Sequence, residues 1–121
     1  MSAVKETIRI NKATVRIRVI EITGKEGDFF VSLSPSLNVS GYGKTKEESQ
    51  DSFKANIHLF CEDLMALPKE QREHELNLLG FKQERDHHKN YSKSYVDENG
   101  ILQNFEEGTL EKTIHEETTC A

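Results

Sequence analysis

The residues Ser-Gly-Tyr-Gly-Lys-Thr at positions 40–45 end in the Gly-Lys-Thr triplet that closes the phosphate-binding loop of many nucleotide hydrolases. Such a loop needs a further glycine five residues before the Gly-Lys pair, because its backbone amides must point at the phosphates. That position is Asn38. The loop must also follow a strand of a parallel sheet, whereas short antiparallel strands are predicted here. We therefore interpret Gly41 and Gly43 as turn residues and Thr45 as a helix cap.

Other residues with reactive side chains are isolated from the partners that catalysis or metal binding needs. His87-His88 would require further ligands, and their charged neighbours are typical of a solvated loop. His115 and Cys120 fall in a polar tail, and His58 lies beside an apolar stripe. Cys61 falls within that stripe, which favours a core thiol over a nucleophile. No two acids share a setting that would separate their pKa values. We expect neither an enzyme nor a metal or cofactor site.

The composition is that of one small domain. With 121 residues, the chain can bury a core without crosslinks, and its two cysteines do not form a disulfide framework. The first residues lack a signal-peptide core, and no apolar run approaches the roughly 20 residues of a membrane span. We expect a cytoplasmic protein without membrane contact.

Charge is distributed unevenly along the chain, whose formal net charge is -5. Residues 106–121 hold five glutamates and one lysine, whereas residues 1–25 hold six basic residues and two glutamates. The acidic tail, 106–121, is predicted to be disordered or to form a frayed helix, because few of its residues are apolar. The preceding residues, 1–105, are predicted to form the domain.

Alternating apolar residues predict strands in the first third of the chain. Val15, Ile17 and Val19 point one way between residues 13 and 22, and a bulge would return Ile20 and Ile22 to that face. Residues 23–28 are predicted to be a turn. Strands at 29–33 and 37–39 would then complete a three-stranded antiparallel meander.

Helical periodicity begins after the meander. Thr45 and Glu48 form a capping box, in which Glu48 would accept from the Thr45 amide. An apolar stripe, Phe53-Ile57-Phe60-Leu64, follows at helical spacing. A short second helix should begin at Pro68 and end at Gly80, and Asn99-Gly100 predicts a hairpin over 91–105. The expected fold is α+β: an antiparallel meander packed on a long helix, with a second short helix and a C-terminal hairpin.

A motif running from the second strand into the long helix resembles the HicB antitoxin family. The resemblance covers about residues 13–66. Its residues are Gly27, Asp28, Phe29, Pro35, Leu37, Gly43, Thr45 and Glu48.

The resemblance implies a truncated ribonuclease H-like domain that lacks that fold's catalytic acids. It also implies a homodimer or larger oligomer, and an antitoxin that sequesters a small basic RNA-cleaving toxin by protein–protein contact. The chain departs from the family pattern at Ser36, where an acidic residue is usual, and in a shortened loop before Gly43. Residues 82–121 also lack the paired-helix pattern of an appended DNA-binding module.

Two alternatives to a protein-binding antitoxin remain open. The first is a nucleic-acid-binding regulator that uses Lys12, Arg16 and Arg18, since alternation places the two arginines on one face. The competing explanation is that charges on an exposed or edge strand serve solubility. The second alternative, a degenerate ribonuclease, follows from fold analogy alone.

Overall fold

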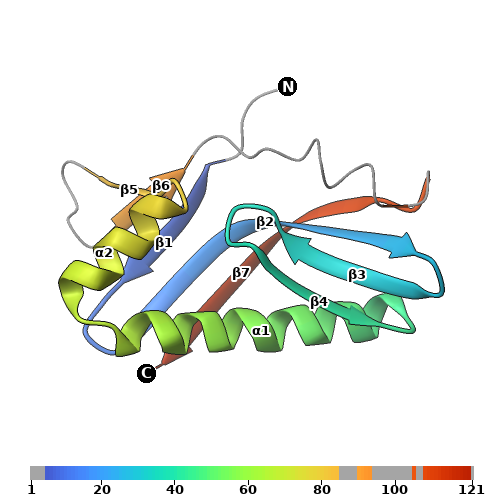
Figure 1. The fold of residues 1–121 in the computed structure, drawn as a ribbon, viewed down its shortest axis with the longest axis horizontal. Helices are drawn as coiled ribbons and strands as arrows, with labels where there is room; N and C mark the ends of the chain where they lie inside the picture. Colours follow the sequence, from blue (N-terminus) through green and yellow to red (C-terminus); the bar gives the residue numbers. More distant parts are fainter. Residues whose placement is uncertain (1–4, 85–89, 94–104, 106–107, 121) are drawn as a thin grey trace.

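The computed structural model describes residues 5–84, 90–93, 105 and 108–120. It has the predicted α+β class: one antiparallel sheet of seven strands lies against a long helix, with a second short helix at one end (Figure 1). The elements, in chain order, are β1 (Glu6–Ile10), β2 (Thr14–Glu26), β3 (Phe29–Ser34), β4 (Val39–Gly43), α1 (Lys46–Ala66), α2 (Lys69–Leu78), β5 (Lys82–Gln83), β6 (Asn90–Lys93) and β7 (Glu111–Cys120).

The thirteen-residue strand β2 is the centre of the sheet. Along one edge it pairs with β7 through ten consecutive residues, from Thr14 opposite Cys120 to Thr23 opposite Glu111. Its other edge is divided: β1 pairs with residues 15–18 and β3 with residues 22–26. β2 therefore joins two half-sheets, β1-β6-β5 and β3-β4, that meet only along it.

A buried glutamate fills the gap between these half-sheets. Glu6, whose exposed fraction is 0 %, accepts a hydrogen bond of 3.0 Å from the backbone N–H of Ile20, in the stretch of β2 that neither β1 nor β3 pairs. The other oxygen of its carboxylate accepts from the Ser36 hydroxyl. The carboxylate thus replaces a missing strand partner, because a buried N–H without an acceptor is costly.

The meander is confirmed as β2-β3-β4, but its first turn is shorter than predicted. β2 continues to Glu26, and only Gly27 and Asp28 connect it to β3, with Gly27 at φ +62°. Gly24 lies within β2, where an added Cβ would come within 2.4 Å of the Phe105 ring. Gly24 is therefore a strand residue covered by an aromatic ring.

The bulge predicted near Ile20 is wrong, since the β2–β7 register runs without interruption. The break in the apolar pattern instead marks a change of face. Val15, Ile17 and Val19 belong to the main core with α1 and α2, whereas Ile20 and Ile22 pack with Phe105 in a smaller cluster. Successive residues of an unbroken strand lie on opposite faces, so both sides of the sheet carry apolar residues along this part of β2.

Helix α1 begins where the capping motif predicts. Thr45 is its N-cap, and the hydroxyl accepts from the Glu48 amide at 3.1 Å. The Glu48 carboxylate, however, accepts from the Lys44 amide at 2.8 Å rather than from the Thr45 amide. Phe60 of the predicted stripe is only partly buried. The buried residues of α1 are Ser49, Phe53, Ile57, Cys61 and Leu64.

Gly41 and Gly43 lie in β4 rather than in a turn, and neither has a positive φ. A Cβ on Gly41 would come within 2.2 Å of the Phe53 nitrogen, and one on Gly43 within 2.4 Å of the Glu48 Cβ. The glycines of the SGYGKT segment therefore allow α1 to lie directly on β4. This close packing explains the glycine spacing without a phosphate ligand.

The second helix, α2, follows Pro68 and ends as predicted. Gly80 has a φ of +91°, and the Phe81 amide donates to the Leu76 carbonyl at 2.9 Å. Leu76 and Phe81 are fully buried. Of the predicted 91–105 hairpin, β6 pairs with β1 and β5, while the Asn99-Gly100 turn lies outside the described residues. No helix within the described ranges is long and apolar enough to cross a membrane.

The prediction of a disordered tail or a frayed helix is wrong for residues 111–120, which form β7. The acidic side chains that favoured disorder have partners in the fold. Glu116 pairs with Arg18 at 3.0 Å, and Glu111 pairs with Lys46 at 2.7 Å. The backbone ladder to β2 supplies the remaining stabilisation, which composition alone does not reveal.

We predict that Glu6→Ala lowers the free energy of unfolding by about 2–4 kcal/mol, because it leaves the Ile20 amide and the Ser36 hydroxyl without their acceptor. Urea denaturation followed by circular dichroism measures the change. Glu26→Ala, at an exposed position of β2, is the matched control and should stay within about 0.5 kcal/mol of wild type. Equal stability of the two variants would contradict the role given to Glu6.

Candidate functional site: an arginine face on the open side of the sheet

Three arginines from β1 and β2 lie on the sheet face opposite α1. Arg9 is directly across from Arg16 in the β1–β2 register, and Arg18 lies two residues further along β2. Their neighbours in the same strands, Ile8 and Ile17, are buried in the core on the helix side. Strand alternation therefore fixes the three guanidinium groups on one surface. We call Arg9, Arg16 and Arg18 the arginine face.

The three arginines differ in their partners. Arg18 forms an ion pair with Glu116 at 3.0 Å and donates to the Lys5 carbonyl at 3.2 Å. Among the described residues, Arg9 and Arg16 form no ion pair. Like charges directly opposite each other across two strands are destabilising. The fold therefore holds two positive charges together, and neither is in an ion pair within the described part of the chain, although Glu116 and Glu117 line the same hollow.

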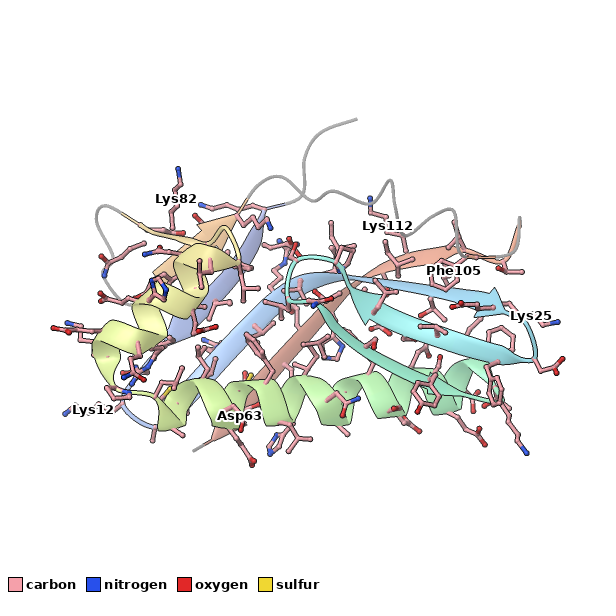
Figure 2. The ribbon with its side chains drawn as sticks, viewed as in Figure 1. Lys12, Lys25, Asp63, Lys82, Phe105 and Lys112 are labelled. Carbon is pink, nitrogen blue, oxygen red and sulfur yellow. The ribbon has the colours of Figure 1, made fainter. Side chains whose placement is uncertain are left out.

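The arginine face borders a shallow hollow of about 260 Å³. Its lining includes hydroxyl groups as well as guanidinium groups, so it offers hydrogen-bond donors of two kinds. Lys82, on β5 beyond β1 and β6, also points away from α1 (Figure 2). The residues that line the hollow include Thr7, Arg9, Arg16, Arg18, Glu116 and Thr118.

Lys12, which the sequence groups with Arg16 and Arg18, lies apart from them. It occupies the connection between β1 and β2, near the end of α1 and the start of α2 (Figure 2). There it lines a different hollow together with Lys69 and Arg72. The predicted patch is therefore divided: Arg16 and Arg18 stay together, Arg9 joins them, and Lys12 does not.

The residues of the HicB-like motif take structural positions. Leu37 is buried in the main core, Thr45 and Glu48 cap α1, and Gly43 contacts the first turn of that helix. Phe29, by contrast, is 47 % exposed at the start of β3. The remaining members lie in the two connections of the meander: Gly27, Asp28 and Pro35.

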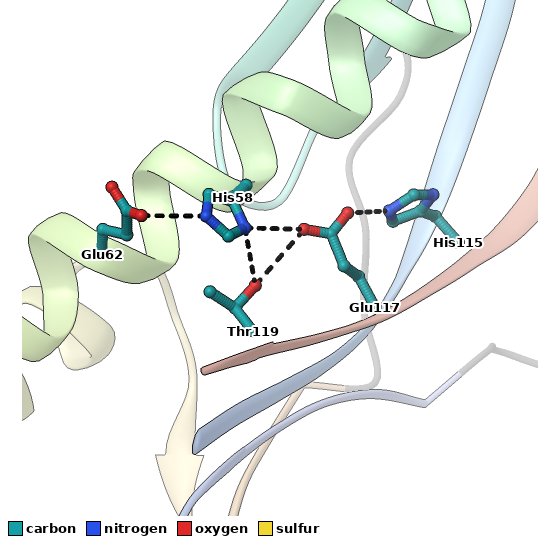
Figure 3. Close-up of polar contacts among 5 residues, drawn as sticks. All are labelled: His58, Glu62, His115, Glu117 and Thr119. Atoms are coloured by element: carbon teal, nitrogen blue, oxygen red, sulfur yellow. Dashed lines mark hydrogen bonds and ion pairs between the residues drawn. The ribbon is translucent and has the colours of Figure 1, made fainter. Parts of the chain in front are cut away.

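A chain of imidazole and carboxylate groups lies on the other face, between β7 and α1 (Figure 3). His115 contacts Glu117 through Nε2 at 3.0 Å and Glu21 through Nδ1 at 3.4 Å. The second oxygen of Glu117 lies 4.0 Å from His58 Nδ1, and His58 Nε2 donates to Glu62 at 2.9 Å. Strands β2 and β7 are thereby connected to α1 through side chains.

This network has the properties of a structural contact. The hydrogen bond to Glu21 raises the pKa of His115, burial opposes that effect, and Glu117 adds to it. The His115 ring also makes an edge contact with Phe53, with ring centroids 5.2 Å apart. Beside the network, burial raises the pKa of Cys61 to about 11, so this thiol is protonated at neutral pH.

In the described part of the chain, the side chains are not arranged for metal binding or for nucleophilic catalysis. Within it, no group of three or more histidine, cysteine or acidic residues is placed to hold a metal ion. His115 lies on β7 with its side chain toward α1, and the side chain of Cys120 is not among those that the structure describes. His87-His88 lie outside the described residues.

Two features of these sites escape the sequence pattern. Arg9 joins the arginine face only because residues 11–13 reverse the chain between β1 and β2, and Asn11, a typical turn residue, is the signal for that reversal. His115 reaches the core only because β7 pairs with β2. The β-branched residues Thr113, Ile114, Thr118 and Thr119 are a weak signal for that strand.

Comparison with protein-family models, curated proteins and solved structures finds no significant match. The resemblance to HicB antitoxins therefore stays a prediction based on the motif in residues 13–66.

We predict that His115 makes stability depend on pH in a defined direction. Because its pKa in the folded state is raised above 6.5, the stabilisation is complete below that pH and is lost as the pH rises through the folded-state pKa. The difference in unfolding free energy between wild type and His115→Gln should therefore shrink from pH 6 to pH 9. Urea titrations at several pH values measure it, and a difference that grows with pH would contradict the prediction.

Proposed function

We propose that the protein is a non-catalytic binding protein whose arginine face contacts the phosphate backbone of a nucleic acid. The observation that carries the proposal is the cross-strand juxtaposition of Arg9 and Arg16, neither of which has an ion-pair partner among the described residues. An anionic ligand would offset the repulsion between them. Phosphate groups match guanidinium donors in geometry as well as in charge.

The position of the arginines also argues against a role in protecting a sheet edge. Natural proteins place charges on edge strands to prevent aggregation. Here β1 lies between β2 and β6, and β2 lies between β1 and β7, so neither strand is an edge. Solubility alone does not require two arginines to face each other on interior strands.

The shape of the site favours contact with the backbone over reading of bases. The arginines lie on a strand surface, and the helices of the main core cover the other face of the sheet. Backbone contacts of this kind give binding that tolerates sequence and weakens with salt. We therefore expect little discrimination between sequences of equal length.

We predict that the protein binds a fluorescein-labelled 20-nucleotide RNA at low salt, and that Arg9→Glu/Arg16→Glu weakens binding by about tenfold or more. For a single strand contacted by three arginines, the logarithm of affinity should fall with the logarithm of salt concentration with a slope of about -2. Fluorescence anisotropy measures both quantities.

The matched control is Lys44→Glu/Lys54→Glu, which makes the same change of charge at two exposed positions away from the arginine face. Its affinity should stay close to that of wild type. Equal loss in both double variants would show that only net charge matters, and an absence of binding at low salt would exclude the proposal.

A HicB-like antitoxin is the second candidate, because α1 presents an acidic outer surface suited to a small basic protein. This helix follows the meander as the resemblance implies. Opposite charge on two surfaces favours association. The exposed acidic residues of α1 are Glu47, Glu48, Asp51, Glu62 and Asp63.

We predict that an equimolar amount of this protein abolishes RNA cleavage by a small basic ribonuclease encoded beside it. A gel assay with purified components measures the cleavage. Arg9→Glu/Arg16→Glu should inhibit as well as wild type, because the acidic surface of α1 is unchanged. Undiminished cleavage in the presence of the wild-type protein would contradict the antitoxin function.

A further inference from the structure

Strand β7 leaves a long open edge on the sheet. Its inner edge pairs with β2 over ten residues, and no strand within the described residues pairs with its outer edge. The other outer strands are protected or short. Asn56 of α1 donates to the Ser40 carbonyl of β4 at 2.7 Å, and β5 has only two residues. The unpaired backbone groups of a long edge are a ready template for another strand.

The sequence of β7 lacks two of the devices that usually prevent such pairing, proline and a bulge, although it carries four charged side chains: Glu111, Lys112, Glu116 and Glu117. Residues 111–120 contain neither proline nor glycine. Their register with β2 has no bulge, so the strand is regular throughout. A regular edge of this length, with which no strand of the described residues pairs, is expected to have a partner strand.

On the face of β7 that carries Ile114, the side chains are complementary to themselves in one two-fold register. When two copies run antiparallel with Ile114 at the centre, Ile114 lies opposite Ile114, and Lys112 lies opposite Glu116 of the second copy on both sides of the axis. On the other face Glu111 lies opposite Glu117, but each of these carboxylates already has a partner in its own chain, Lys46 and His115. Ile114 is 40 % exposed in one chain and would be covered. Moving the centre to Glu116 would instead place two glutamates opposite each other, which is unfavourable.

We propose that two copies of this protein pair through the outer edges of their β7 strands, centred on Ile114, to form one continuous sheet. A two-fold axis perpendicular to the sheet keeps each face on its own side, so the two arginine faces lie on the same surface of the dimer. The functional role of this shared arginine surface rests on the proposed nucleic-acid binding, whereas the dimer itself does not.

The test is a disulfide scan of β7 in a Cys120→Ser background, where the other cysteine, Cys61, is buried. In the proposed dimer the two Ile114→Cys positions have Cα atoms about 4.5–5.5 Å apart, within the range for a disulfide. Thr118→Cys is the matched control on the same exposed face. The register places its two copies about 27 Å apart, because eight residues of strand separate them.

We expect Ile114→Cys to give a covalent dimer on mild oxidation and Thr118→Cys to stay uncrosslinked, with circular dichroism confirming that both are folded. Equal crosslinking of both variants, or of neither, would overturn the proposed register. Light scattering after size exclusion provides a second measurement. A wild-type protein that remains a monomer at 100 μM, or that pairs only with a strand of another protein, would overturn the dimer.

Charge exchange tests the register without cysteines. Lys112→Glu puts acidic side chains opposite each other on both sides of the axis and should weaken self-association by about tenfold or more. Adding Glu116→Lys to that variant should restore self-association, because each opposed pair then again combines one acidic and one basic side chain. Failure of the second change to restore the dimer would count against pairing centred on Ile114.

Discussion

The fold depends on which groups pair with the backbone N–H and C=O groups along the two edges of β2. One edge is taken by β7 along ten residues, and the other is shared by two strands that leave a stretch of β2 without a ladder partner. Glu6 supplies the missing acceptor to Ile20 from a fully buried position. Because both half-sheets meet only at β2, the contact between Glu6, Ile20 and Ser36 fixes how β1 is placed relative to β3.

The unbroken register of β2 also determines which chemistry lies on which face. Alternation sends Arg16 and Arg18 to the open surface, while Glu21 and its ion-pair partner His115 turn toward α1. A bulge would have exchanged these sets over half of the strand. The same regularity gives β7 its straight outer edge, so the arginine face and the proposed dimer both follow from one continuous pairing of two strands.

Sequence patterns predict the local parts of this structure well. Thr45 and Gly80 mark helix ends through contacts within a few residues, and the meander follows from alternation and turn residues. The long-range parts are less accessible. Pairing of β7 with β2 joins residues about a hundred positions apart. From the sequence alone Glu116 is one charge of an acidic tail, and only the fold places Arg18 beside it. The sequence does not group Arg9 with Arg16 for a similar reason: its position depends on the register across the β1–β2 connection.

Hydrogen exchange of individual backbone amides, followed by NMR, tests most directly the claim that β2 is held along both edges. The account predicts strong protection of the Ile20 amide, and of those amides in residues 111–120 that face β2, with opening free energies near that of global unfolding. Exchange of residues 111–120 at the rate of an unstructured peptide, together with an unprotected Ile20 amide, would contradict it.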